Sequence, residues 1–179
     1  MYNIKRISII AMLLAMAIVV SVLESFIPMF IPGFKLGLAN VIILIMLYEF
    51  KAGEAFTVDI LRIVIVGLLR GTFLSPIFIM SLSGGLLSFF AMWLFTRVKI
   101  FTPIGVSVVG AVTHSLGQIV AAIFIIGTNA VIYYFPFVGL LSLGSGILSG
   151  FIAYTYLRRS ITNKFVDVKN YNNLDVDGQ

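Results

Sequence analysis

Long apolar runs, separated by short segments that are polar or rich in glycine and proline, dominate this chain. A helix crosses the roughly 30 Å hydrocarbon layer of a bilayer with about 20 apolar residues. By that measure the pattern predicts an all-α integral membrane protein, a bundle of six transmembrane helices, with a break near Pro136 at the start of the long sixth segment. The predicted spans are Ile7–Leu23, Leu36–Phe50, Ala52–Leu69, Pro76–Phe95, Ile104–Ile126 and Ala130–Leu157.

The composition supports this reading and narrows the chemistry. Of the 179 residues, 60% are hydrophobic and 11% are charged, whereas soluble domains are about half apolar and a quarter charged. This excludes a cytosolic enzyme, a disordered chain and a nucleic-acid binder. Cysteine is absent, so disulfides and thiolate nucleophiles are excluded. One histidine and seven acidic residues leave too few ligands for an ordinary metal site, and we predict no metal and no cofactor.

Basic residues set the orientation of the predicted bundle. If the N- and C-termini are both cytoplasmic, nine basic residues lie in cytoplasmic segments and only Lys35 and Arg70 lie in external ones. This positive-inside bias accounts for most of the net charge of +5. We therefore expect a multi-pass protein of the bacterial cell membrane. Residues 1–160 form a single transmembrane domain, and the polar residues 161–179 form a disordered cytoplasmic tail.

Two charged residues fall inside the third predicted span. Ionisable side chains cost about 2.5–3.5 kcal/mol each at the centre of a membrane helix, so they are candidates for function. Asp59 and Arg62 are three residues apart, a spacing that permits a side-chain pair. In one interpretation the two residues only neutralise each other inside the bundle. In the other, Arg62 meets an anionic group that enters from outside.

The fifth predicted span and the first external segment hold further polar candidates. His114 and Gln118 are four residues apart and share a helical face, which fits either a polar cavity or an interhelical hydrogen bond. Lys35 and Asn40 straddle the outer start of the second span, as rim groups of an outward-facing pocket or as a snorkelling lysine and a helix cap. We predict a substrate-binding site of Lys35, Asn40, Arg62, His114 and Gln118.

Small residues at four-residue spacing predict close helix packing. Ala11 and Ala15 form such a pair in the first span, and Gly146 and Gly150 form another in the sixth. The alanine pair leaves a shallow strip where the backbone of another helix can approach. We predict that this strip faces out of the bundle and docks a partner; the alternative is packing inside the bundle.

Sequence motifs of common catalytic machinery are absent. The chain has no Gly-rich phosphate loop ending in Gly-Lys-Ser/Thr, no Asp-Asp-x-x-Asp run for magnesium and a prenyl diphosphate, and no nucleophile elbow. We therefore predict that the protein is not an enzyme.

Several motifs in order resemble those of the Gx transporter family, often labelled heptaprenyl diphosphate synthase component I. The resemblance covers about residues 5 to 158. It is carried by the stretch from Pro32 to Asn40 (PGFKLGLAN), Leu61-Arg62, Gly67 with Gly71, Ser75-Pro76, Ser81–Gly85, and the run from Gly105 to His114 with Gly117-Gln118.

This family is similar to the substrate-binding S components of energy-coupling-factor transporters. The resemblance implies six helices, cytoplasmic ends, a ligand pocket open to the outside and a vitamin-like substrate, with a flavin favoured. It also implies that Ala11 and Ala15 dock a transmembrane coupling subunit that works with ATPases. The family label implies a different function, an accessory subunit of isoprenoid-quinone biosynthesis, and a structural partner of an electron-transfer complex is a third possibility.

Overall fold

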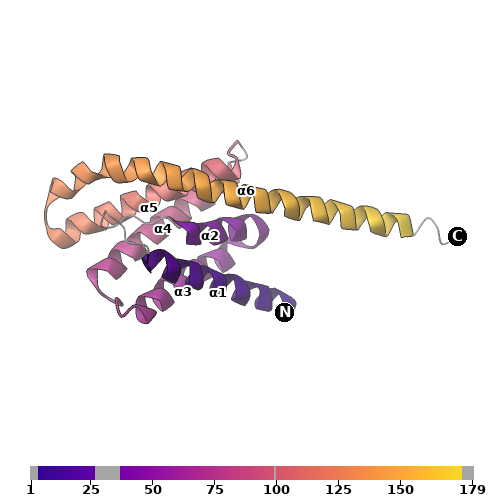
Figure 1. Cartoon of the computed structure of the whole chain (residues 1–179), viewed down its shortest axis with the longest axis horizontal. Helices are drawn as coiled ribbons and strands as arrows, with labels where there is room; N and C mark the ends of the chain where they lie inside the picture. Colours follow the sequence, from indigo (N-terminus) through magenta and orange to yellow (C-terminus); the bar gives the residue numbers. More distant parts are fainter. Residues whose placement is uncertain (1–3, 27–36, 99, 175–179) are drawn as a thin grey trace.

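The computed structural model describes residues 4–26, 37–98 and 100–174, with side chains as far as Ser160. All the regular secondary structure in these ranges is helical, and α1 begins at the same end of the molecule at which α6 ends (Figure 1). An even number of crossings requires this arrangement. The elements are α1 (Ile4–Phe26), α2 (Leu38–Glu49), α3 (Ala52–Leu69), α4 (Pro76–Arg97), α5 (Pro103–Ile126), the 3-10 helix η1 (Asn129–Tyr134) and α6 (Phe135–Leu174).

The six predicted spans are confirmed as six helices, which differ in how well each is suited to cross a membrane alone. By length and composition α1, α4, α5 and the segment Asn129–Ser160 are each able to cross. Helix α2 is apolar but has only 12 residues, and α3 carries Glu54, Asp59 and Arg62 in 18 residues. These two helices therefore depend on the rest of the bundle.

Helix α2 lies at the centre of the fold. It contacts all five other α-helices, and six consecutive residues, Val41–Met46, are buried. A helix that is apolar on every side is stable only when it is enclosed. The adjoining core is completed by side chains such as Val58 of α3, Met92 of α4 and Val106 of α5.

Helices α4, α5 and α6 pack through small residues. A methyl group added at Gly117 of α5 would lie 2.8 Å from the carbonyl oxygen of Ser83 in α4. One added at Gly146 of α6 would lie 2.8 Å from the Cα atom of Val108 in α5. Buried serines join the α5–α6 seam, where the Oγ atoms of Ser107 and Ser149 are 2.9 Å apart. The close packing expected from the glycine pair in α6 is confirmed.

Helix α1 is the peripheral element. Among the described elements it contacts only α2 and α3, and Ala17 and Glu24 are its only buried residues. At its first turns Arg6 donates to both carboxylate oxygens of Glu54 in α3, at 3.0 and 2.7 Å. Both Ala11 and Ala15 are exposed. The alanine strip therefore points away from the bundle, as the sequence predicted.

The break expected near Pro136 is present. The 3-10 helix η1 ends at Tyr134, and α6 begins at Phe135. Proline is tolerated in the first turn of a helix because its missing N–H would have no partner there. The backbone of α6 continues as a helix to Leu174; the disorder of the tail from residue 161 stays a prediction.

Two glycines on nearly opposite faces of α6, Gly146 and Gly144, test this packing. We expect Gly146→Ala to lower the free energy of unfolding by about 1–3 kcal/mol, because its methyl would overfill the contact with α5. Gly144 is exposed with no neighbouring atom within 4 Å, so Gly144→Ala should be neutral or stabilising by up to about 1 kcal/mol. Thermal unfolding in detergent by circular dichroism measures both; equal melting temperatures would contradict the packing described.

Candidate functional site

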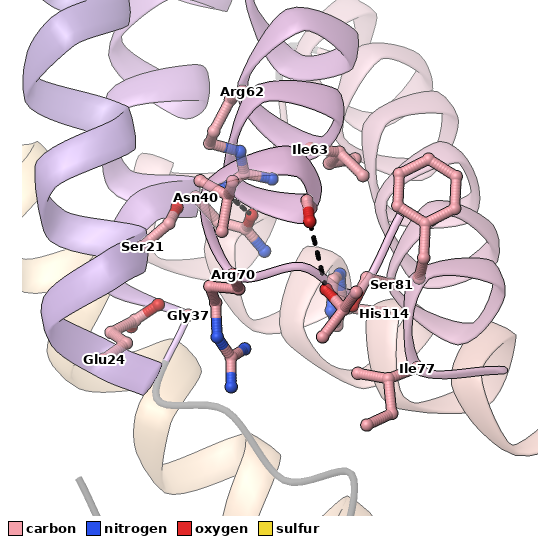
Figure 2. Close-up of a pocket in the computed structure, with 14 residues that line it drawn as sticks. Ser21, Glu24, Gly37, Asn40, Arg62, Ile63, Arg70, Ile77, Ser81 and His114 are labelled. Carbon is pink, nitrogen blue, oxygen red and sulfur yellow. Dashed lines mark hydrogen bonds between the residues drawn. The ribbon is translucent and has the colours of Figure 1, made fainter. Parts of the chain in front are cut away.

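A pocket lies at the end of the bundle where α1 and α3 end and α2 and α4 begin. Figure 2 shows its polar lining side chains, which come from α1 to α5. By the positive-inside prediction this is the external end. The polar lining includes Ser21 and Glu24 of α1, Asn40 of α2, Arg62 of α3, Arg70 and Thr72 just after α3, Ser81 of α4 and His114 of α5.

The pocket is narrow. Its volume is about 60 Å³, whereas pockets for small organic ligands measure roughly 300–1,000 Å³. The pocket thus accepts water or a small fragment, and a flavin-sized molecule requires the surrounding helices to separate.

Arg62 links the core of the bundle to the pocket. Its Nη2 donates to Oδ1 of Asp59 at 2.6 Å. Its Nη1 donates to Oδ1 of Asn40 at 3.4 Å (Figure 2). Arg62 is 5% exposed and Asp59 is 2% exposed, so the pair predicted from the three-residue spacing is confirmed. The Nε of Arg62 is buried without a hydrogen-bond partner in the described part of the chain. Arg62 therefore retains donor capacity after its ion pair has formed.

Glu24 caps the N-terminus of α2. Gly37 precedes α2 in the left-handed conformation, with φ of 69° and ψ of 19°, and has no side chain with which to cap the helix. The backbone N–H of Leu38 instead donates to Oε1 of Glu24 at 2.5 Å. A carboxylate is favourable there because the first N–H groups of a helix lack partners and carry partial positive charge. Glu24 thus supplies from α1 the cap that α2 lacks.

His114 and Gln118 share a face of α5 but have different surroundings. His114 lines the pocket. Gln118 is 3% exposed and is not part of the lining. A methyl group added at Gly84 of α4 would lie 2.8 Å from Cγ of Gln118 and 3.1 Å from Nε2 of His114. The shared face is therefore covered by α4, with only its His114 end reaching the pocket.

The structure brings together three of the five predicted binding residues: Asn40, Arg62 and His114. Gln118 lies in the α4–α5 seam, and Lys35 lies outside the described residues. Of the lining residues that the prediction omitted, Glu24 had a signal in the sequence, because a carboxylate that follows an apolar run is costly in a membrane unless it has a partner. Ser21 and Ser81 have no such signal.

The fold and the pocket define a multi-pass helical membrane protein with a polar site enclosed by its spans. The chain matches the family described as heptaprenyl diphosphate synthase component I over residues 13–156. It belongs to this family, as the motifs in its sequence indicated. No curated protein and no solved structure matches the chain.

The buried ion pair generates a prediction. Arg62→Ala leaves Asp59 buried and unpaired, which should destabilise the protein by about 3–5 kcal/mol. The double variant Asp59→Asn with Arg62→Ala removes both charges and should recover most of the folded yield. Folded monomer is measured by size-exclusion chromatography after heating in detergent.

Arg70→Ala is the matched control, because Arg70 lines the same pocket from an exposed position. It should keep the stability of the parent protein. If Arg62→Ala alone were as stable as this control, the ion pair would not hold the bundle together.

Proposed function

We propose that the protein is a membrane-embedded binding protein for a small anionic or polar-aromatic molecule, working like the S component of an energy-coupling-factor transporter. The observation that carries this proposal is the convergence of Asn40, Arg62 and His114, from three different helices, on one pocket. A vitamin-like ligand is the substrate class, with a flavin favoured by the family resemblance. The protein has no catalytic step of its own in this proposal.

The unused hydrogen-bond donor of the pocket favours an anionic or acceptor-rich ligand. Its described lining holds two cationic side chains, Arg62 and Arg70, and one carboxylate, Glu24, and Asp59 balances the charge of Arg62. The carboxylate is engaged with the backbone of Leu38, whereas Arg62 has an unused buried donor. An acidic or acceptor-rich group on the ligand would complete the hydrogen bonding of Arg62, which is worth about 1.5–3 kcal/mol for a charged donor.

Admission of a larger ligand requires one helix to move, and α1 is the best suited. It contributes Ser21 and Glu24 to the pocket but contacts only α2 and α3. The α4–α6 half is fixed by glycine contacts between backbones. Displacement of α1 would widen the pocket at a cost restricted to those two contacts and to the Glu24 cap.

The exposed strip of Ala11 and Ala15 supports docking of a transmembrane coupling subunit. Both alanines lie on the face of α1 that is turned away from the bundle. Small residues let another helix backbone approach closely in lipid. Because α1 also lines the pocket, a partner on this strip would be positioned to couple its own movement to ligand release, with ATPases supplying the energy.

The family description favours a second candidate function, a membrane accessory subunit in heptaprenyl diphosphate and isoprenoid-quinone biosynthesis. In that role the protein would recruit or stabilise a prenyl synthase and would transport nothing. The two functions differ in what the purified protein carries: a small molecule in the first, a soluble synthase subunit in the second.

The binding function is tested on full-length protein purified from native membranes. We expect a co-purified small molecule in its mass spectrum, with flavin absorbance if the ligand is a flavin. Arg70→Gln should weaken rebinding of that molecule about tenfold, because one charged hydrogen-bond donor is lost. Arg159→Gln is the control, because Arg159 is exposed on α6 and does not line the pocket. Absence of any ligand, together with recovery of a prenyl synthase, would favour the accessory function.

The docking strip is tested separately. Ala11→Trp and Ala15→Trp should leave the isolated protein folded and able to bind ligand, because both positions are exposed. Assembly with the coupling subunit and uptake in cells should fall strongly, because the indole keeps the two backbones apart. Ile9→Trp, also exposed on α1 at 44% but on a different face from the alanines, shows whether any bulky residue on this helix has the same effect. Unchanged assembly in both alanine variants would refute the docking role.

A further inference from the structure

A second cavity lies at the opposite end of the bundle, where α2 ends, α3 begins and α4 ends. Its volume is about 390 Å³, and its lining includes Tyr48, Lys51, Trp93, Thr96 and Arg97. We call it the inner cleft, since the positive-inside prediction places this end at the cytoplasmic surface. None of its lining residues belongs to the pocket described above.

Positive charge in the inner cleft is not neutralised by an ion pair. Lys51 and Arg97 are exposed, and neither forms a salt bridge within the described ranges. Two carboxylates are near: Glu54 pairs with Arg6 and accepts from the backbone N–H of Lys51, and Glu49 accepts a hydrogen bond from Ser160 at 2.6 Å but keeps its charge. The N-terminus of α3 offsets the partial negative charge of one of the two helix C-termini there, those of α2 and α4. The three basic side chains Arg6, Lys51 and Arg97 outnumber the two carboxylates, so the cleft is positive overall.

The cleft also has an aromatic wall. The guanidinium carbon of Arg97 lies 5.7 Å from the centre of the Trp93 ring, a cation–π distance that keeps the arginine at the edge of the cleft. Tyr48 and Trp93 are 39% and 37% exposed. Partly exposed Trp and Tyr beside basic residues mark the depth of lipid headgroups.

An apolar track leaves the cleft toward the membrane interior. Phe90 and Leu94 of α4 are 52% and 57% exposed. Phe90, Trp93 and Arg97 are spaced by three and four residues, so they follow one face of α4. A hydrocarbon chain that starts at Arg97 can therefore lie along this face while its headgroup remains in the cleft.

We propose that the inner cleft binds an amphiphile whose phosphate headgroup is anionic overall, with its phosphate between Lys51 and Arg97 and its hydrocarbon chain along the Phe90 face of α4. The phosphate supplies the negative charge that the cleft lacks, and the chain covers apolar surface. A bilayer phospholipid and a prenyl diphosphate share this chemistry. The inference is independent of the proposed transport function, because it uses other residues at the other end of the bundle.

Trp93 provides the readout, because it is the chain's single tryptophan and lines the cleft. Full-length protein in mixed micelles is titrated with phosphatidylglycerol brominated on its acyl chains, and quenching of the Trp93 emission is followed. We expect saturable quenching that farnesyl diphosphate reverses by competition. Phosphatidylcholine with the same brominated chains should quench at least tenfold more weakly, because its headgroup has no net charge.

Lys51→Gln and Arg97→Gln should each weaken the apparent affinity about fivefold, since each basic residue near an anionic surface contributes a factor of that size. The double variant should lose about 25-fold by the same reasoning. Arg159→Gln makes the same charge change on α6 outside the cleft and should have no effect. Circular dichroism checks that each variant is folded.

The competitors identify the source of the phosphate. Stronger competition by farnesyl diphosphate than by unbrominated phosphatidylglycerol indicates a dedicated prenyl ligand, and the reverse order indicates a bilayer lipid; both support the proposal. Equal quenching by the phosphatidylglycerol and phosphatidylcholine probes, or unchanged affinity in the folded double variant, would overturn it.

Discussion

The burial of α2 is the constraint on which the rest of this fold depends. Twelve residues of helix extend about 18 Å, well short of the roughly 30 Å hydrocarbon layer. Alone, such a helix would leave its terminal N–H groups in lipid, where each unpaired group costs several kcal/mol. The five surrounding helices replace lipid with protein along the length of α2. At its first turn Glu24 accepts from Leu38, so a carboxylate from α1 completes what α2 lacks.

The position of the pocket follows from the shortness of α2. The helix ends at Glu49, close to the charged groups at the start of α3. It is therefore the N-terminus of α2 that falls short of the bundle's end. Longer neighbours surround that end, and their outer turns line the pocket above the N-terminus of α2. The two halves of the wall differ in rigidity. Glycine contacts hold α4 to α5 and α5 to α6. Among the described elements, α1 contacts only α2 and α3.

The number of helices, the ion pair and the outward strip of α1 could be predicted because each has a local signature: an apolar run, a three-residue spacing, a repeat of small residues. The surroundings of Gln118 could not. Helical spacing places it on the same face as His114, but the seam that covers it exists because Gly84 lets α4 approach there. The sequence marks Glu24 as a costly carboxylate after an apolar run, but it does not reveal the partner of Glu24, which is a backbone N–H in another helix. Neither contact has a short-range pattern in the sequence.

Stability alone does not account for the pair of Asp59 and Arg62. Replacing a buried ion pair by well-packed apolar side chains is often neutral or stabilising, because both charges lose their hydration. The bundle has apolar side chains in abundance, yet α3 carries this pair next to the pocket at the expense of its own suitability as a span. Asp59 orients Arg62 by accepting from its Nη2, and Asn40 accepts from its Nη1 at 3.4 Å. In the proposed function this arrangement presents a buried cation to an incoming acceptor, which packing alone would not require of α3.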